Sequence, residues 1–295
     1  MAEYLTSELI TRVREEGFSP PGMADADILN RINRTLWNDV FPLIKDVSEE
    51  HFVKSVDYTS YSSGILIPAR AGYSSIREIK IFTGNSTVSP INQIDLPRVP
   101  LSQIEHDNWR GFYFEGNRIK ILPDTGGNTG TVRVYYFFRP SEMVDEGNCA
   151  KITALDTTLK TVTVSSVPAG ITTSVLVDFV QGKPQFDPLA IDQTISSIVS
   201  TTITFSSALP DGLAVNDWVT INQQSPVPQI PLEAFDLLVY GSALRLVRHA
   251  KDPQGYQMAQ QAFEMEKQKI REILSPRADG APLIFKNNSS GYFRP

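Results

Sequence analysis

The chain opens with segments whose apolar residues recur at the period of an α-helix. Residues 6–16 carry such a stripe, and Gly17 follows where helices commonly end. A second stripe extends over residues 25–44, where Pro42 is expected to kink or end the helix. The apolar positions of this second stripe lie at i, i+4 spacing: Ile28, Ile32, Leu36 and Val40. Two N-terminal helices are therefore predicted.

The helical period returns near the end of the chain. Residues 232–250 and 256–274 each carry an apolar stripe, and a Pro-Gly interruption at 252–255 separates them. The second of these stripes consists of Ala259, Phe263, Ile270 and Leu274. Pro276 ends the pattern. Because two short helices cannot bury an apolar stripe by themselves, we expect the N-terminal and C-terminal pairs to pack into one bundle.

Between the helical ends, apolar and polar residues alternate with the period of a β-strand. Residues 111–122 predict a hairpin that turns at Gly116-Asn117. Residues 131–138 show the clearest alternation, and Pro140 follows them. The other strands are expected at 52–58, 64–67 and 76–82.

Residues 148–226 are predicted to form an inserted all-β module. Thr163-Val-Ser-Ser166 is echoed 41 residues later by Thr204-Phe-Ser-Ser207. Two related β units folded against each other would give this echo, and so would chance similarity among Ser- and Thr-rich strands. The aromatic residues of the module stand at positions that face a core: Phe179, Phe186, Phe205 and Trp218. Residues 225–231, with three prolines, are expected to be a stiff extended connector.

These patterns predict an α+β protein. A helical bundle is made from the N- and C-terminal helices, and a β-rich middle carries the inserted all-β module. The expected parts are N-terminal bundle helices at 1–50, a β-rich segment at 51–147, the acidic β insert at 148–226, C-terminal bundle helices at 227–275 and an extended tail at 276–295.

Charge is unevenly distributed along the chain. The 295 residues carry a net charge of −6. Residues 141–230 hold three lysines against nine carboxylates, a composition that disfavours a nucleic-acid groove there because phosphate binding needs clustered Lys and Arg. With no apolar run of membrane-spanning length and no secretory signal at its start, the chain is expected to be intracellular when made.

The chain offers few groupings of reactive side chains. Asp124-Thr-Gly126 matches the short motif of aspartic proteases, but its Gly- and Asn-rich surroundings favour a turn. His51, His106 and His249 lie on different elements without ligand spacing, and Cys149 has no nearby histidine. Neither a phosphate-binding Walker loop nor a Gly-x-Ser-x-Gly motif is present. We expect no enzymatic activity, cofactor or metal.

The last twenty residues, 276–295, are too short and too rich in Pro, Gly, Asn and Ser to fold alone, yet they carry several apolar and aromatic side chains. Such a segment suits ordering on the sheet or groove of a partner. Packing back on its own bundle is the alternative.

Four segments stand out in their order along the chain: Asp27-Ile-Leu-Asn-Arg-Ile-Asn-Arg-Thr-Leu-Trp37, Asp217-Trp-Val-Thr-Ile221, Pro226-Val-Pro-Gln-Ile-Pro231 before a long helix, and Ile273-Leu-Ser-Pro-Arg277 before a basic, Asn-rich tail. In these segments and their order the chain resembles the head-to-tail adaptor (connector) proteins of tailed bacteriophages, which form a ring that docks beneath the portal.

The resemblance implies a structural virion protein of the neck and tail, made in the host cytoplasm, that assembles as a ring of twelve copies. DNA would pass through the channel without specific binding. The C-terminal tail would clasp the portal protein, and the β insert would contact the next tail component, a nozzle or tail tube, or fibres. The portal interface implied in this way consists of Arg277, Leu283, Ile284, Phe285, Lys286, Tyr292, Phe293 and Arg294.

Two other functions remain open at this point. One is a peripheral tail or baseplate module that binds fibre or host carbohydrate through the β insert. The other is a hydrolytic virion enzyme that uses Asp124.

Overall fold

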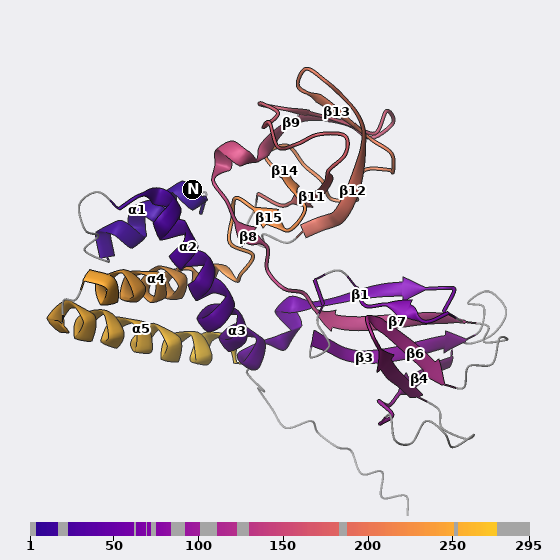
Figure 1. The fold of residues 1–295 in the computed structure, drawn as a ribbon, viewed down its shortest axis with the longest axis horizontal. Helices are drawn as coiled ribbons and strands as arrows, with labels where there is room; N and C mark the ends of the chain where they lie inside the picture. Colours follow the sequence, from indigo (N-terminus) through magenta and orange to yellow (C-terminus); the bar gives the residue numbers. More distant parts are fainter. Residues whose placement is uncertain are drawn as a thin grey trace, which may run out of the picture.

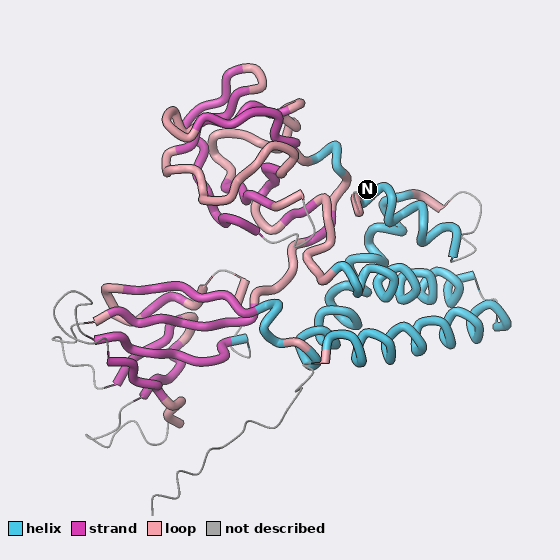
Figure 2. The backbone as a smooth tube through the Cα atoms, turned by 180° about the vertical axis from the view of Figure 1, so that it is seen from behind, coloured by secondary structure: helices cyan, strands magenta, loops and turns pink. Residues whose placement is uncertain are grey.

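The computed structural model describes residues 4–16, 23–61, 63–68, 70–71, 75–83, 92–100, 111–122, 130–182, 188–250 and 253–275. It is a mixed α+β fold in which N-terminal and C-terminal helices share one bundle (Figure 1). Figure 2, from behind, shows two β-rich parts projecting from this bundle as separate lobes. No helix within the described ranges is both long enough and apolar enough to cross a membrane.

The helical bundle confirms that the two ends of the chain pack together. Helix α4 contacts α1, α2 and α5, and α3 also contacts α5. Leu9, Ile28 and Ile32 from the first helices are fully buried in the same core as Leu238 and Leu246 from α4. The helices are α1 (Thr6–Glu16), α2 (Asp25–Thr35), α3 (Phe41–Val47), α4 (Phe235–Ala250) and α5 (Pro253–Leu274). The predicted i, i+4 stripe therefore does face the core, with Ile28 and Ile32 on α2 and Leu36 and Val40 on the segment that follows it.

The sequence predicted that Pro42 would kink or end the second helix. In the structure the helix does not end at Pro42. A π-helical segment, Leu36–Val40, follows α2, and α3 continues the helix to Val47. The Phe41 N–H donates to the carbonyl of Leu36, five residues earlier. Pro42 then lies in the first turn of α3, where the absence of its N–H is tolerated because the wider π turn precedes it.

The first β-rich part, here called the sheet module, consists of two sheets that share a core. One sheet has the order β1-β7-β3-β4 and the other β2-β6-β5. Ile79 and Val134 from the first sheet meet Ile119 from the second. The predicted hairpin is confirmed as β5–β6, with Gly116 in the left-handed region at φ 59°. The strands are β1 (Val53–Tyr58), β2 (Ile65–Leu66), β3 (Ile76–Thr83), β4 (Asn92–Leu96), β5 (Gly111–Glu115), β6 (Arg118–Leu122) and β7 (Thr131–Phe137).

The second β-rich part is a closed antiparallel barrel with the strand order β10-β13-β12-β11-β14-β9. Its core contains Phe179 and Phe205, and Trp218 is also buried, as their positions predicted; Phe186 lies outside the described residues. The strands are β9 (Ala150–Asp156), β10 (Thr161–Val164), β11 (Leu176–Val180), β12 (Pro188–Val199), β13 (Thr202–Phe205) and β14 (Trp218–Ile221).

The barrel gives the internal echo a structural meaning. Val162 of β10 faces Ile203 of β13, and these two residues lie 41 apart in the chain. Asp178 of β11 likewise faces Thr220 of β14, 42 residues later. The order of β9, β10 and β11 thus recurs as β12, β13 and β14, and the two units interleave around one barrel. This arrangement matches two related β units folded against each other.

The connection that leads into the barrel is hydrogen-bonded to the helical bundle. The Asn33 side chain of α2 accepts a hydrogen bond from the Met143 N–H (2.8 Å) and donates one to the Met143 carbonyl (3.0 Å). Met143 belongs to the short strand β8 (Glu142–Met143), which pairs in parallel with β15 (Gln224–Ser225). The predicted connector 225–231 follows β15, and it is buried over residues 225–230. The connector is thus a strap enclosed by the protein, a burial that its proline pattern did not predict.

Candidate interaction surface on helix α5

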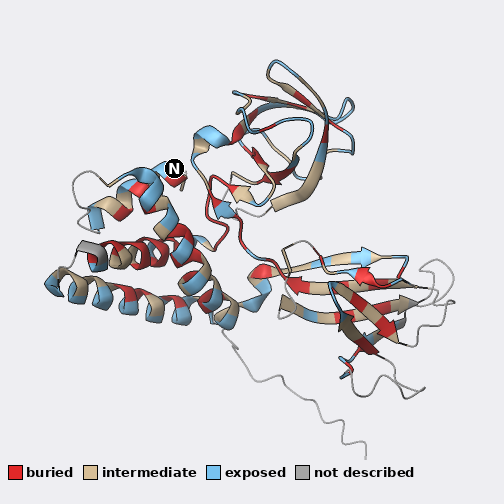
Figure 3. Ribbon diagram, viewed as in Figure 1, coloured by how far each residue is buried: buried red, intermediate tan, exposed pale blue. Residues whose placement is uncertain are grey.

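Helix α5 is a helix of 22 residues that buries a single narrow stripe. Phe263, Glu266 and Ile270 are buried, whereas most other side chains of α5 are exposed or half-buried, as Figure 3 shows. The predicted members Phe263 and Ile270 are confirmed as core residues, and Ala259 and Leu274 are half-buried.

A glycine of α4 allows this stripe to approach closely. A Cβ atom on Gly241 would lie 2.8 Å from a ring carbon of Phe263 and 2.6 Å from Cγ2 of Thr35. Neither approach is possible for a real Cβ atom, so α4 can be held this closely between α2 and α5 only where residue 241 lacks a side chain. Gly241 therefore allows the Phe263 face of α5 to pack against α4, and the opposite face of α5 remains exposed to solvent.

The outer face of α5 carries a stripe of large uncharged side chains. Met258, Gln261, Met265 and Gln268 follow one another at alternating spacings of four and three residues. Met258 is 66% exposed and Met265 is 73% exposed. On a straight helix this spacing places side chains along one line, and it is the spacing that helices use to pack against each other. We call these four residues the α5 stripe.

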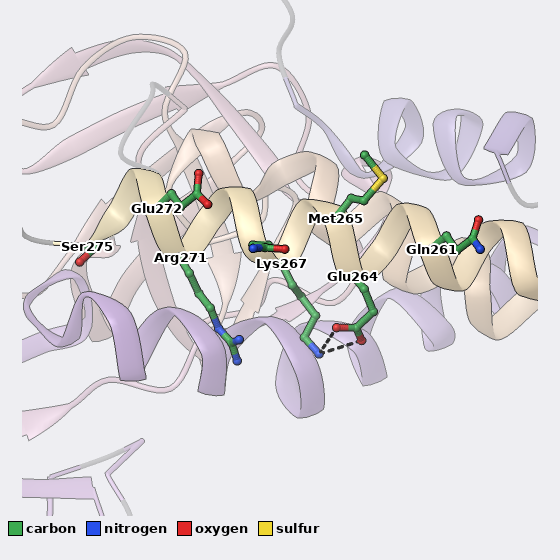
Figure 4. Close-up of a pocket in the computed structure, with 8 residues that line it drawn as sticks. Gln261, Glu264, Met265, Lys267, Arg271, Glu272 and Ser275 are labelled. Carbon is green, nitrogen blue, oxygen red and sulfur yellow. Dashed lines mark hydrogen bonds and ion pairs between the residues drawn. The ribbon is translucent and has the colours of Figure 1, made fainter.

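An open groove of about 1050 Å³ runs beside the second half of the stripe (Figure 4). Met265 and Glu272 project from one side of the helix, and Lys267 and Arg271 project from the other. The described residues that line the groove belong to α5 or directly follow it: Gln261, Glu264, Met265, Lys267, Gln268, Arg271, Glu272 and Ser275. This part of α5 is thus open to solvent among the described residues.

Charged side chains on α5 pair within the helix. Lys267 lies 3.1 Å from Glu264, and Lys269 lies 2.8 Å from the buried Glu266. The hydrogen bond to Glu266 raises the pKa of the Lys269 ammonium group. The four residues of the α5 stripe are themselves uncharged, and two of the charged groups beside them are already paired, so covering the stripe strips water mainly from methionine and amide groups.

No known protein family and no curated protein matches this chain.

The portal-interface residues implied by the sequence resemblance all fall in 276–295, outside the described residues. His106 and Asp124 also lie outside them, and the side chain of His249 is not described. His51 lies in a short 3₁₀ helix, Glu49–Phe52. The centres of the His51 and Phe52 rings are 4.8 Å apart, and the two rings are nearly perpendicular. Of the three histidines, only His51 has a described side chain, so the described residues show no histidine cluster.

Cys149 is a buried thiol near the start of the barrel, only 3% exposed. Burial raises its pKa to about 12, with a further contribution from the carboxylates of Glu146 and Asp145. A thiol with this pKa is protonated at neutral pH, as is typical of a buried cysteine.

The α5 stripe was not predicted from the sequence, because the same helix carries a second apolar stripe, with Phe263 and Ile270, that faces the core. The available signal was the heptad interval between Met258 and Met265, with Gln261 and Gln268 continuing it. Such a heptad spacing indicates an outer contact surface only when a different face of the same helix is known to pack in the core.

Proposed function

We propose that this chain is the structural adaptor between the portal and the tail of a tailed bacteriophage. Copies of the chain form a ring, the bundle builds the wall of that ring, and DNA passes through the channel without specific binding. The tail 276–295 clasps the portal protein, and the barrel faces the next tail component or fibres. The role is structural and requires no catalytic group.

The observation that carries the proposal is the exposure of α5. A monomeric protein usually covers the apolar side chains of a long helix, and exposed apolar patches mark interaction sites. Here Met258 and Met265 are left outside on the last helix before the tail, at the edge of a bundle that joins both ends of the chain. In the proposed ring, the α5 stripe lies against the bundle of a neighbouring copy.

The barrel offers less support for the alternative of a carbohydrate-binding module. Carbohydrate sites commonly use exposed aromatic rings as stacking surfaces. In the described part of the barrel, Phe179, Phe205 and Trp218 are all at most 6% exposed. These rings are buried in or beside the barrel core, so no described aromatic side chain of the barrel is exposed for stacking against a sugar.

The first experiment measures the mass of the purified chain alone and after mixing with portal rings from the same phage. We expect the chain to add to the portal in a fixed stoichiometry, and deletion of 276–295 to abolish this addition. Replacing Asn287 and Asn288 by Ala is the matched control, because it changes the tail without removing an apolar or charged side chain. Absence of binding by the full chain would refute the adaptor proposal.

A second experiment tests the contact between copies. The double variant Met258→Glu and Met265→Glu places two carboxylates on the α5 stripe. We expect it to remain folded and to lose assembly into rings on the portal. Leu159→Glu is the control, because Leu159 is also 66% exposed but lies on a barrel hairpin. Normal ring assembly by the double variant would exclude the α5 stripe from the contact.

A further inference from the structure

The barrel is joined to the rest of the protein by two neighbouring stretches of chain. One stretch, 138–149, leads from the sheet module into the barrel, and the other, 222–231, leads back to α4. Two adjacent connections of this kind are a common place for one part of a protein to turn relative to another. The orientation of the barrel therefore depends on what else holds it at this point.

A buried ion pair lies between the two connections. The guanidinium group of Arg70 contacts the carboxylate of Asp178, and their side chains are 3% and 0% exposed. Arg70 also donates to the hydroxyl of Ser141 (2.8 Å) and to the Asn222 side-chain oxygen (3.1 Å). The sheet module, the outgoing connection, the barrel and the returning connection are thus bonded to one side chain.

The Asp178 carboxylate is held from the barrel side as well. Its two oxygens accept hydrogen bonds from the backbone N–H groups of Asp192 and Gln223, each at 2.9 Å. Burial raises the pKa of the Asp178 carboxyl, and the charge of Arg70 together with these two N–H groups opposes the shift. The carboxylate thus has partners on β12 and on the returning connection in addition to Arg70.

Arg70 is preset for this contact by the sheet module. It lies in the connection between β2 and β3 with a left-handed backbone, φ 69°, beside a turn in which the Ala71 N–H donates to the Pro68 carbonyl (3.0 Å). Its guanidinium group lies 5.1 Å from the centre of the Phe138 ring, just after β7. An arginine with a left-handed backbone carries a conformational cost, and here that backbone is found in a residue whose side chain is bonded at the junction.

A buried ion pair is a poor way to gain stability, because removing two charges from water costs about as much as their attraction returns. What such a pair can supply is a single permitted geometry, since every other orientation leaves a buried charge without its partner. Arg70 and Asp178 are 108 residues apart in the chain and belong to different β-rich parts. Their pairing therefore restricts the angle between these parts.

We propose that Arg70 and Asp178 form a latch that fixes the barrel in one orientation relative to the sheet module, and that the barrel turns about its two connections when the latch is broken. This inference does not depend on the proposed adaptor function. In any assembly that holds the bundle, the latch sets the direction in which the barrel points.

The test measures the distance distribution between two spin labels by pulsed electron paramagnetic resonance. One label is attached at Leu159→Cys on the barrel and the other at Glu115→Cys on the sheet module, both at exposed positions. The native Cys149 is buried and should not take up label. We expect a narrow distribution for the parent protein and a broadened or shifted one for Arg70→Met and for Asp178→Asn.

Asp57→Asn is the control, because Asp57 pairs with Arg133 inside the sheet module and does not cross the junction. If a single variant fails to fold, the double variant Arg70→Met with Asp178→Leu replaces the ion pair by an apolar pair that a buried site tolerates. A broadened or shifted distribution in the folded double variant supports the latch. A distribution as narrow as that of the control, at the same distance, overturns it.

Discussion

Gly241→Ala tests whether the close packing of α4 between α2 and α5 is needed for the bundle. In an exposed helix the change would stabilise by about 1 kcal/mol, because alanine is the better helix former. At this position the new methyl group would lie 2.6 Å from Thr35 Cγ2 and 2.8 Å from the Phe263 ring. Overpacking of this kind costs about 1–3 kcal/mol. The net loss of stability then lies between about 0 and 2 kcal/mol, and we expect about 1 kcal/mol.

The two neighbours of Gly241 have little room to move. Thr35 is fully buried, and its hydroxyl donates to the Arg31 carbonyl at 3.0 Å, which holds its side-chain rotamer. Phe263 is 7% exposed and lies between α4 and the outer part of α5. The added methyl group should therefore push α5 outward, so that the α5 stripe is displaced together with the loss of stability.

The assay is urea unfolding followed by the helical circular dichroism signal, which reports mainly on the bundle. Ser242→Ala is the matched control, since Ser242 is the next residue of α4, and its fully buried hydroxyl has no hydrogen-bond partner among the described residues. Removing that hydroxyl should leave stability unchanged or raise it by about 1 kcal/mol. A Gly241→Ala protein as stable as the parent would show that the bundle relaxes without cost, and the packing argument would be refuted.

Three further predictions concern the junction, the sheet module and the barrel. Asn33→Ala should lower the unfolding free energy by about 2 kcal/mol, because it leaves the buried N–H and carbonyl of Met143 without partners, and urea unfolding measures this loss. The side-chain hydrogen bond from Arg133 lowers the pKa of Asp57, so the pair stabilises the fold above the unfolded pKa of about 4 and this contribution is lost as the pH falls through the lowered folded value. Since the pair is exposed, the acid-dependent difference between parent and Asp57→Asn in urea midpoints should correspond to less than about 1 kcal/mol. Cys149, with a pKa of about 12, should react with a thiol reagent at pH 8 far more slowly in the native protein than in urea, and equal rates would contradict its burial.

Local patterns were sufficient for elements that depend on neighbours in the chain. The helix at Thr6–Glu16 and the hairpin that turns at Gly116 follow from apolar spacing and from one glycine with a left-handed backbone. The union of the N- and C-terminal helices also followed, because each pair has an apolar stripe with no other place to be buried. Pro42 was misread as a possible helix end, since the π turn that accommodates it depends on packing around Leu36–Val40.

The sequence by itself thus determined the α+β class, the inward faces of the helices and the presence of a β insert with an internal echo. The tertiary structure alone decided that the two units of the insert close into one barrel, that the connector 225–231 is buried, and that α5 leaves its methionine stripe outside. It also decided that Arg70 meets Asp178. Spacing along the chain indicates which residues share one face of a helix or strand. The pairing of Arg70 with Asp178, 108 residues apart, depends on how the sheet module and the barrel are placed in space, and no local sequence pattern contains that information.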